Sequence, residues 1–274
     1  MKRTWEIAAG VVALVLLGAA AFLWLNESQP PVAPPTAAPP LAASPPPAAA
    51  PASEPVVRYP VDSSPAEQEA TVPLDPGAAL TELFGRKTVL SMFQLQDFPR
   101  RFVATVDNLG RSHAPVGLWP VNPTAGRFNV EKQNGADVIS ADNELRYTPY
   151  VLLIETIDLR QAVAVYRRLY PQLQKAYEDI GYPNRYFNDR LVDVIDLLLA
   201  TPDITGPQAV HLPTINGPMQ PERPWVLYEF DDPALQSLAA GQRILLRMGP
   251  VNERRMKTKL AEVRRLVTAG DPPR

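Results

Sequence analysis

The sequence predicts an α+β, mainly α-helical globular domain with a small antiparallel sheet, preceded by a single transmembrane helix and a disordered Pro-rich linker. Three observations support this fold class. Residues 7–25 are apolar throughout, and residues 30–76 contain 15 prolines in 47 positions. The remaining chain, about 200 residues, combines helix-period segments with a hairpin signal, and this length is enough for one well-cored domain.

The apolar run at 7–25 has the length of a membrane-spanning helix, because a bilayer core of about 30 Å needs about 20 apolar residues. Trp5 and Trp24 lie at its two ends, as suits interfacial tryptophans. Lys2 and Arg3 precede the run. By the positive-inside rule, residues 1–6 are then a cytoplasmic tail and the chain after the run lies outside.

A cleaved signal peptide is the alternative, since the three alanines at 19–21 offer a small-residue cleavage site. The apolar run continues past them to Leu25 and is longer than a usual signal core, which favours a retained anchor. Both interpretations export the domain. The chain has no cysteine, which excludes a lipoprotein anchor and a disulfide, so the fold depends on its own core.

The proline-rich stretch is mixed with alanine, serine and valine. Such a composition cannot form a packed core and favours extended polyproline II. At about 3.1 Å per residue it reaches up to roughly 145 Å. We therefore expect a disordered linker at 26–74, a globular domain at 75–268 and a disordered tail at 269–274.

The domain is expected to begin with three helices. An Asp-Pro pair at 75–76 supplies an N-cap followed by proline at the first helical position, which predicts a helix to Phe84. A second helix is expected at 87–94. Asp97 is the expected N-cap of a third, which reaches Leu109.

A hairpin is expected after these helices. The stretch around Trp119 is rich in proline and glycine and indicates a loop. Short strands follow at 127–131 and 137–140. The Asn-Gly pair at 134–135 between them is typical of a two-residue hairpin turn.

The middle of the domain is expected to be helical. A helical phase of apolar residues runs from Leu159 to Ile180 and passes through Pro171, which predicts a kinked helix or two helices that abut there. Asn188 is the expected N-cap of a further apolar helix that ends near Ala200.

The last third begins with loop and a strand at 225–230, where aromatic and aliphatic residues gather. A second Asp-Pro pair, at 232–233, starts a helical stretch that is expected to bend at Gly241. Asn252 is the expected cap of the last helix. Its apolar face consists of Met256, Leu260, Val263 and Val267.

The chemistry-bearing residues give little sign of catalysis. His113 and His211 are the two histidines and form no HxxxH pair. Neither a Walker-type nor a G-x-G-x-x-G phosphate-binding motif is present. We expect no catalytic residues, no cofactor and no metal. From Leu74 onward the chain contains 24 Lys and Arg and 23 Asp and Glu. The domain is thus close to neutral, whereas a global polyanion binder would be more basic.

Several carboxylates remain open to two interpretations. Asp189, Asp193 and Asp196 lie at i, i+4 and i+7, and a solvated stripe is favoured over a cation or acid–base site. In the first turn, Asp189 also suits the helix dipole. The alternative function is an envelope glycan-acting enzyme that uses carboxylates alone, with Glu155, Glu178, Asp189 and Asp193 as candidate acids.

Tyrosines are concentrated in one segment, since seven of nine lie between residues 147 and 186. Tyr166, Tyr170 and Tyr177 recur at helical spacing, with two arginines at 167–168. Tyr-Arg surfaces suit sugar or partner contacts, because both side chains stack and donate hydrogen bonds. Packing at the rim of the core, with the hydroxyls in water, is the favoured interpretation.

The strongest candidate binding surface is basic. Arg254, Arg255 and Lys257 lie near the start of the last helix, shortly after Arg243 and Arg247. Such a cluster suits an acidic envelope polymer, a phospholipid head group or an acidic protein face. The competing interpretation is a solvated amphipathic helix with cations near its C-terminal end.

Four stretches carry a resemblance to a known family: LFGRK at 83–87, RFVATVDNL at 101–109, YFNDR at 186–190 and LRMGP at 246–250. The chain resembles, over residues 75–268, a bacterial family known only as a domain of unknown function. The resemblance implies an N-terminal membrane segment, a proline-rich linker and a domain of this length. It implies no activity and no catalytic residues.

The expected function is that of a single-pass protein of the bacterial inner membrane, with a cytoplasmic N-terminus. Its periplasmic C-terminal domain would be a non-enzymatic binding or scaffold domain on an extended linker. The expected partners are the membrane and an envelope protein or cell-wall component, and not nucleic acid. The alternatives are the carboxylate-dependent enzyme and an anionic lipid- or polymer-binding module.

Overall fold

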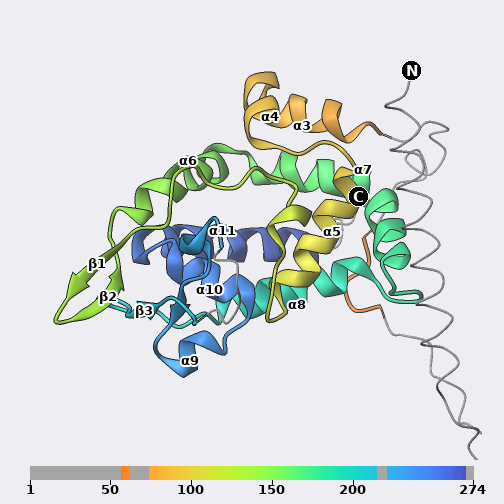
Figure 1. Cartoon of the computed structure of the whole chain (residues 1–274). Coiled ribbons are helices and arrows are strands. Elements are labelled where there is room, and N and C mark those ends of the chain that lie inside the picture. The colour runs from red at the N-terminus through yellow and green to blue at the C-terminus, as the bar shows by residue number, and fades with distance from the viewer. Residues whose placement is uncertain (1–56, 62–73, 215–220, 270–274) are drawn as a thin grey trace, which may run out of the picture. The chain divides into compact units, whose positions relative to one another are not determined.

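The computed structural model describes residues 57–61, 74–214 and 221–269. These residues are mainly helical, with two small antiparallel sheets of two strands each (Figure 1). The expected mainly helical domain with a small antiparallel sheet is thereby confirmed.

The predicted membrane span at 7–25 lies outside the described residues, as do most of the predicted linker at 26–74 and residues 270–274 of the predicted tail. In the part of the chain that the structure describes, no helix is both long and apolar enough to cross a membrane.

A pair of short helices opens the described domain. The first, α3 (Pro76–Phe84), has the predicted cap, since the Asp75 carboxylate accepts hydrogen bonds from backbone N–H groups of the first turn. Gly85 ends α3 with a φ of 78°, a conformation that glycine adopts without strain. The next helix, α4 (Arg86–Met92), is shorter than the predicted 87–94. The two helices and the start of the next share a small core of Leu80, Val89 and Phe98.

The third helix, α5 (Phe98–Leu109), has the predicted extent. Asp97 precedes it but does not cap it through its side chain, which corrects the prediction. Its backbone is left-handed, with φ 55° and ψ 38°, whereas a capping residue has extended backbone angles. A 3₁₀ turn, η1 (Val116–Leu118), follows in the predicted loop.

The predicted hairpin is present as β1 (Val130–Gln133) and β2 (Ala136–Ile139), paired antiparallel. Asn134 and Gly135 connect the strands with φ values of 51° and 86°. Two successive positive φ angles define the type I′ turn that the Asn-Gly pair predicts.

The strand predicted at 225–230 is wrong for most of its length. Residues of η2 (Pro224–Val226) form a 3₁₀ turn, and only β4 (Glu229–Phe230) pairs with β3 (Val210–His211). Proline lacks an N–H and fixes its own φ, which favours a turn over strand pairing here. The sheet contributes to a buried cluster of Val210, Phe230 and Leu246.

Three longer helices follow the hairpin: α6 (Asn143–Thr156), α7 (Leu159–Asp179) and α8 (Phe187–Leu199). The sequence patterns did not predict α6, which contains Pro149. The helical phase at 159–180 is a single helix that includes Pro171, so two abutting helices are excluded.

The C-terminal part contains α9 (Pro233–Gln236), α10 (Ala240–Arg247) and α11 (Pro250–Thr268). Asp232 caps α9 as predicted. The predicted bend at Gly241 is wrong, because the interruption comes before α10. Gly241 lies within α10, where the missing side chain allows close contact with α5 and α8.

The core forms where α5, α7, α8 and α11 pack against one another (Figure 1). The apolar face predicted for the last helix is confirmed, with Met256 and Leu260 against the central cluster and Val263 and Val267 in a second one. Fully buried members of the central cluster include Val103, Val151, Leu173 and Phe187.

Two asparagines predicted as helix caps have another role. Tyr186 and Gly249 occupy the N-cap positions of α8 and α11. Asn188 and Asn252 lie inside those helices and are 0% and 3% exposed. The amide of Asn252 donates to the carbonyl of Glu144 at the start of α6. These side chains therefore connect elements rather than cap helices.

Candidate functional site

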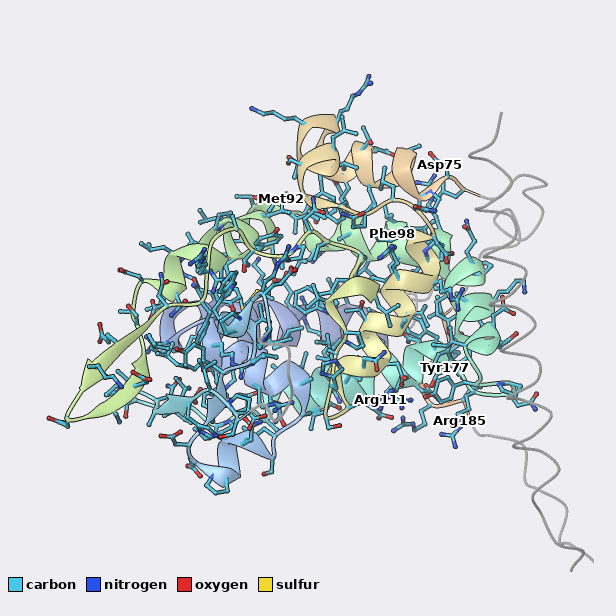
Figure 2. All side chains as sticks on the ribbon, in the orientation of Figure 1. Asp75, Met92, Phe98, Arg111, Tyr177 and Arg185 are labelled. Carbon is cyan, nitrogen blue, oxygen red and sulfur yellow. The ribbon has the colours of Figure 1, made fainter. Side chains whose placement is uncertain are left out.

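A cavity of about 670 Å³ lies in the described part of the chain. Its wall comes from the end of α5, the end of α7, the α7–α8 loop, the start of α8 and the segment 57–61. Figure 2 shows Arg111, Tyr177 and Arg185 at this end of the fold. The lining is mostly charged and aromatic, and includes Arg111, Tyr177, Tyr182, Arg185, Arg190 and Asp193.

Asp107, on the last turn of α5, organises one side of the cavity. Its side chain is only 6% exposed, and it forms ion pairs with Arg111 at 2.7 Å and Arg190 at 2.9 Å. The Tyr182 hydroxyl donates to the same carboxylate and accepts from Arg111. The charge of Asp107 raises the pKa of Arg111 above its ordinary value. One buried carboxylate therefore fixes two guanidinium groups at the cavity wall.

The α7–α8 loop supplies an aromatic surface and a further cation. Tyr182 stacks on Tyr177 with ring centroids 4.5 Å apart. Burial raises the pKa of Tyr177, and the nearby charge of Asp107 acts in the same direction. Arg185 is exposed, and its guanidinium makes no hydrogen bond or ion pair with the residues described by the structure. It is thus available to a ligand.

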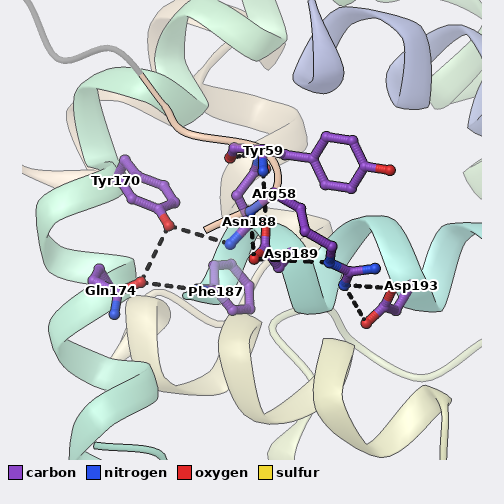
Figure 3. A network of polar contacts seen from close by, with 8 residues as sticks. All are labelled: Arg58, Tyr59, Tyr170, Gln174, Phe187, Asn188, Asp189 and Asp193. Atoms are coloured by element: carbon purple, nitrogen blue, oxygen red, sulfur yellow. Dashed lines mark hydrogen bonds and ion pairs between the residues drawn. The ribbon is translucent and has the colours of Figure 1, made fainter. Parts of the chain in front are cut away.

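The segment 57–61 closes the other side of the cavity by binding α8 (Figure 3). The Asp189 carboxylate accepts from the backbone N–H groups of Arg58 and Tyr59 at 3.0 and 2.8 Å. The Arg58 guanidinium donates to Asp193 at 2.8 Å, and this hydrogen bond is the main reason that the pKa of Arg58 is raised. The Asn188 amide donates to the Tyr59 carbonyl at 2.9 Å.

The prediction of a solvated stripe of three aspartates holds only in part, because the Asp189 side chain is 15% exposed whereas those of Asp193 and Asp196 are 46% and 44% exposed. Asp189 and Asp193 hold the segment 57–61, while Asp196 pairs with Arg264 of α11. The pKa of Asp196 is lowered, chiefly by that hydrogen bond. No cluster of three or more His, Asp and Glu side chains within the described ranges has the geometry of a metal site.

The four acids named for the enzyme alternative do not converge. Asp189 and Asp193 line the cavity, but Arg58 and backbone amides already engage them. Glu155 lies 3.6 Å from Arg255, and Glu178 accepts from a glutamine of α7. Among the described residues of the cavity lining, the carboxylates are all engaged by other protein groups, so the lining does not offer an unengaged pair of carboxyl groups for acid–base catalysis.

The predicted basic cluster is divided by the fold, and its α10 members are largely committed to the protein. Arg247 lies over the Phe230 ring and donates to the Tyr228 carbonyl at 2.7 Å. Burial lowers its pKa, and the neighbouring Arg243 adds to this effect. Arg243 donates to the carbonyl of Ser112.

The α11 members of the cluster differ in exposure. Arg254 and Arg255 are exposed, and Arg255 approaches Glu155. Lys257 donates to Asp203 at 2.7 Å and is 15% exposed. Burial acts to lower the pKa of Lys257, but hydrogen bonds to Asp203 and Glu253 outweigh it and raise the pKa. Polyanion binding at these five residues stays a prediction.

The helical tyrosines are mostly core residues. Tyr166 and Tyr170 pack in the core, and their hydroxyls donate to Asn188 and Gln174 rather than pointing into water. Tyr177 is 3% exposed and belongs to the same core, although it also contributes to the cavity wall. The more exposed Tyr182 and Tyr186, which follow α7, line the cavity beside Arg185.

The histidines do not form a catalytic pair. His211 Nδ1 lies 2.6 Å from Asp231, and its other ring nitrogen lies 3.9 Å from Glu229. This exposed group is on the β3–β4 sheet, and its side chains are absent from the cavity lining. His113 lies in the loop after α5.

The sequence patterns singled out Tyr177, Asp189 and Asp193 of the cavity lining but not its other charged residues. Asp107 and Arg190 fall within the stretches 101–109 and 186–190 that carry the family resemblance. The family resemblance of these two stretches was the sequence signal that could have identified Asp107 and Arg190. Arg111 follows Asp107 by four residues, a spacing typical of a helical ion pair, but no local spacing relates it to Tyr182, 71 positions away. No sequence pattern marked Arg185.

The fold and the cavity define a mainly helical domain with a charged, tyrosine-lined site. The chain belongs to the family described as "Protein of unknown function (DUF3014)", whose model matches residues 98–264, more than half of the chain. This confirms the resemblance to a family of unknown function. The matched range contains every cavity residue named above except Arg58. Neither the curated proteins nor the solved structures that were compared contain a match to the chain.

Proposed function

We propose that this protein displays a periplasmic binding domain on a single inner-membrane anchor and an extended linker. The apolar run at 7–25, its flanking tryptophans and the basic residues before it support the anchor and its orientation. The proline-rich stretch supports a spacer, because polyproline II is extended. The proposed partner is an envelope protein or a cell-wall component.

The observation that carries the binding role is the cavity with its exposed Arg185. A volume of about 670 Å³ is within the range of small-molecule sites, which is about 300–1,000 Å³. Asp107 holds the two neighbouring arginines in place before any ligand arrives. Such preorganisation lowers the entropic cost of binding.

Binding is favoured over catalysis because the acids of the cavity are engaged. Asp107 is held by arginines and a tyrosine, Asp189 by backbone amides and Asp193 by Arg58. The groups left for a ligand are guanidinium N–H donors and aromatic faces. These groups recognise and orient a ligand, and they lack the titration range of a general base near neutral pH.

In-cell photocrosslinking tests the proposal. With a benzophenone amino acid in place of Arg185, the full-length protein is expected to give a discrete crosslinked adduct in intact cells. Arg168 of α7 is the matched control, because it is an exposed arginine outside the cavity lining. Equal adducts at the two positions, or no adduct at residue 185, would contradict a binding role for the cavity.

A further inference from the structure

We infer that the cavity binds a saccharide that carries a carboxylate, such as a uronic acid unit of a glycan. This inference rests on the proposed function and names the chemical class of its ligand. It depends on three properties of the cavity: the free donors, the sum of the charges and the orientation of the tyrosines.

The free donors belong to three arginines. Arg111 uses Nε and Nη2 to bind Asp107 and Tyr182, and Arg190 uses Nε and Nη2 to bind Asp107. Among the described residues, neither Nη1 atom has a partner. Arg185 adds a whole guanidinium group. A planar fork of N–H donors matches the two oxygens of a carboxylate.

The sum of the charges favours a single negative charge on the ligand. The lining contains four arginines and three aspartates, so its formal charge is +1. A carboxylate neutralises this charge, whereas a doubly charged phosphate monoester leaves an excess negative charge inside the cavity. The three aspartates of the lining repel that excess negative charge.

Tyr182 presents an aromatic surface to the ligand. Its hydroxyl is turned toward Asp107 and Arg111, so it is occupied by the protein. One face of its ring stacks on Tyr177, which is 3% exposed, and the ring lines the cavity. Aromatic faces beside fixed hydrogen-bond donors suit a sugar ring, which has apolar C–H faces and polar edges.

Titration of the full-length protein in detergent tests this assignment with three probes. Galacturonate carries both the sugar ring and one carboxylate. Galactose is its uncharged counterpart, and lactate has one carboxylate but no sugar ring. Galacturonate is expected to bind, with affinities for the other two at least tenfold weaker. Equal binding of galactose would show that the carboxylate is not recognised, and equal binding of lactate would show that the sugar ring is not recognised.

Two variants localise the binding. Arg185→Ala is expected to weaken galacturonate binding at least tenfold, because it removes a guanidinium group that has no partner among the described residues and can bind the carboxylate. The control Arg168→Ala is expected to change it less than twofold. Unchanged binding by Arg185→Ala would show that the cavity is not the binding site. An adduct at residue 185 in cells, together with no galacturonate binding, would rule out the ligand class alone. Absence of both the adduct and the binding would overturn the proposed function as well.

Discussion

Replacing Asp107 with alanine is expected to lower the free energy of unfolding by about 2–3 kcal/mol, because the hydrogen bonds that its buried carboxylate accepts from charged and polar groups are lost. The carboxylate is 6% exposed, while Arg190 is 27% exposed and depends on it for orientation. The substitution leaves Arg190 and the Tyr182 hydroxyl without their acceptor. Chemical denaturation of the full-length protein measures the change.

Asp179→Ala is the matched control for this prediction. Asp179 pairs with Lys175 four residues earlier, as Asp107 pairs with Arg111 four residues later, but both side chains of the control pair are exposed. Exposed pairs contribute about 0–1 kcal/mol. Similar losses for the two variants would show that the Asp107 network is not the buried support described above.

Asn188→Ala is expected to lower the free energy of unfolding by about 3 kcal/mol, because several buried groups lose their partners at once. Asn188 is 0% exposed. Its amide donates to the carbonyls of Tyr59 and Val267, and its oxygen accepts from the Tyr166 hydroxyl. The side chain therefore joins α7, α8, α11 and the segment 57–61, and Figure 3 shows Asn188 beside Tyr59 of that segment.

The same variant is expected to release the segment 57–61, which limited trypsin digestion after Arg58 detects as faster cleavage. Asn108→Ala is the control, since the Asn108 amide makes a single bond to a carbonyl of its own helix. Its expected cost is below about 1 kcal/mol. Cleavage of the Asn188 variant at the rate of this control would count against the described anchoring.

Local signals predicted the local structure well. The Asp-Pro pair at 75–76 and the Asn-Gly pair at 134–135 act through their own backbone and immediate neighbours, so their meaning depends little on the rest of the fold. Asn188 shows where such signals fail. An asparagine before an apolar run predicts a helix N-cap. Asn188 instead lies inside the helix, where its buried amide hydrogen-bonds to residues far away in the chain.

The cavity was beyond prediction because it is assembled from distant parts of the chain. Asp107 and Arg190 are 83 positions apart, and Arg58 and Asp193 are 135 apart. No spacing rule relates such pairs. The predicted basic cluster does not form one surface for a related reason. Helical spacing predicts which residues share a face of a helix, but not which other elements cover that face. Arg247, for example, is buried against Phe230.

The central claim is that the domain lies outside the cytoplasm, where its cavity can meet an envelope ligand. The absence of cysteine makes a direct measurement available, because one introduced cysteine is the only thiol. Ala261 is exposed on α11, and Thr4 lies in the predicted cytoplasmic tail. With a membrane-impermeant maleimide on spheroplasts, Ala261→Cys is expected to be labelled without lysis and Thr4→Cys only after lysis. The opposite pattern, or protection of Ala261→Cys until lysis, would contradict the account.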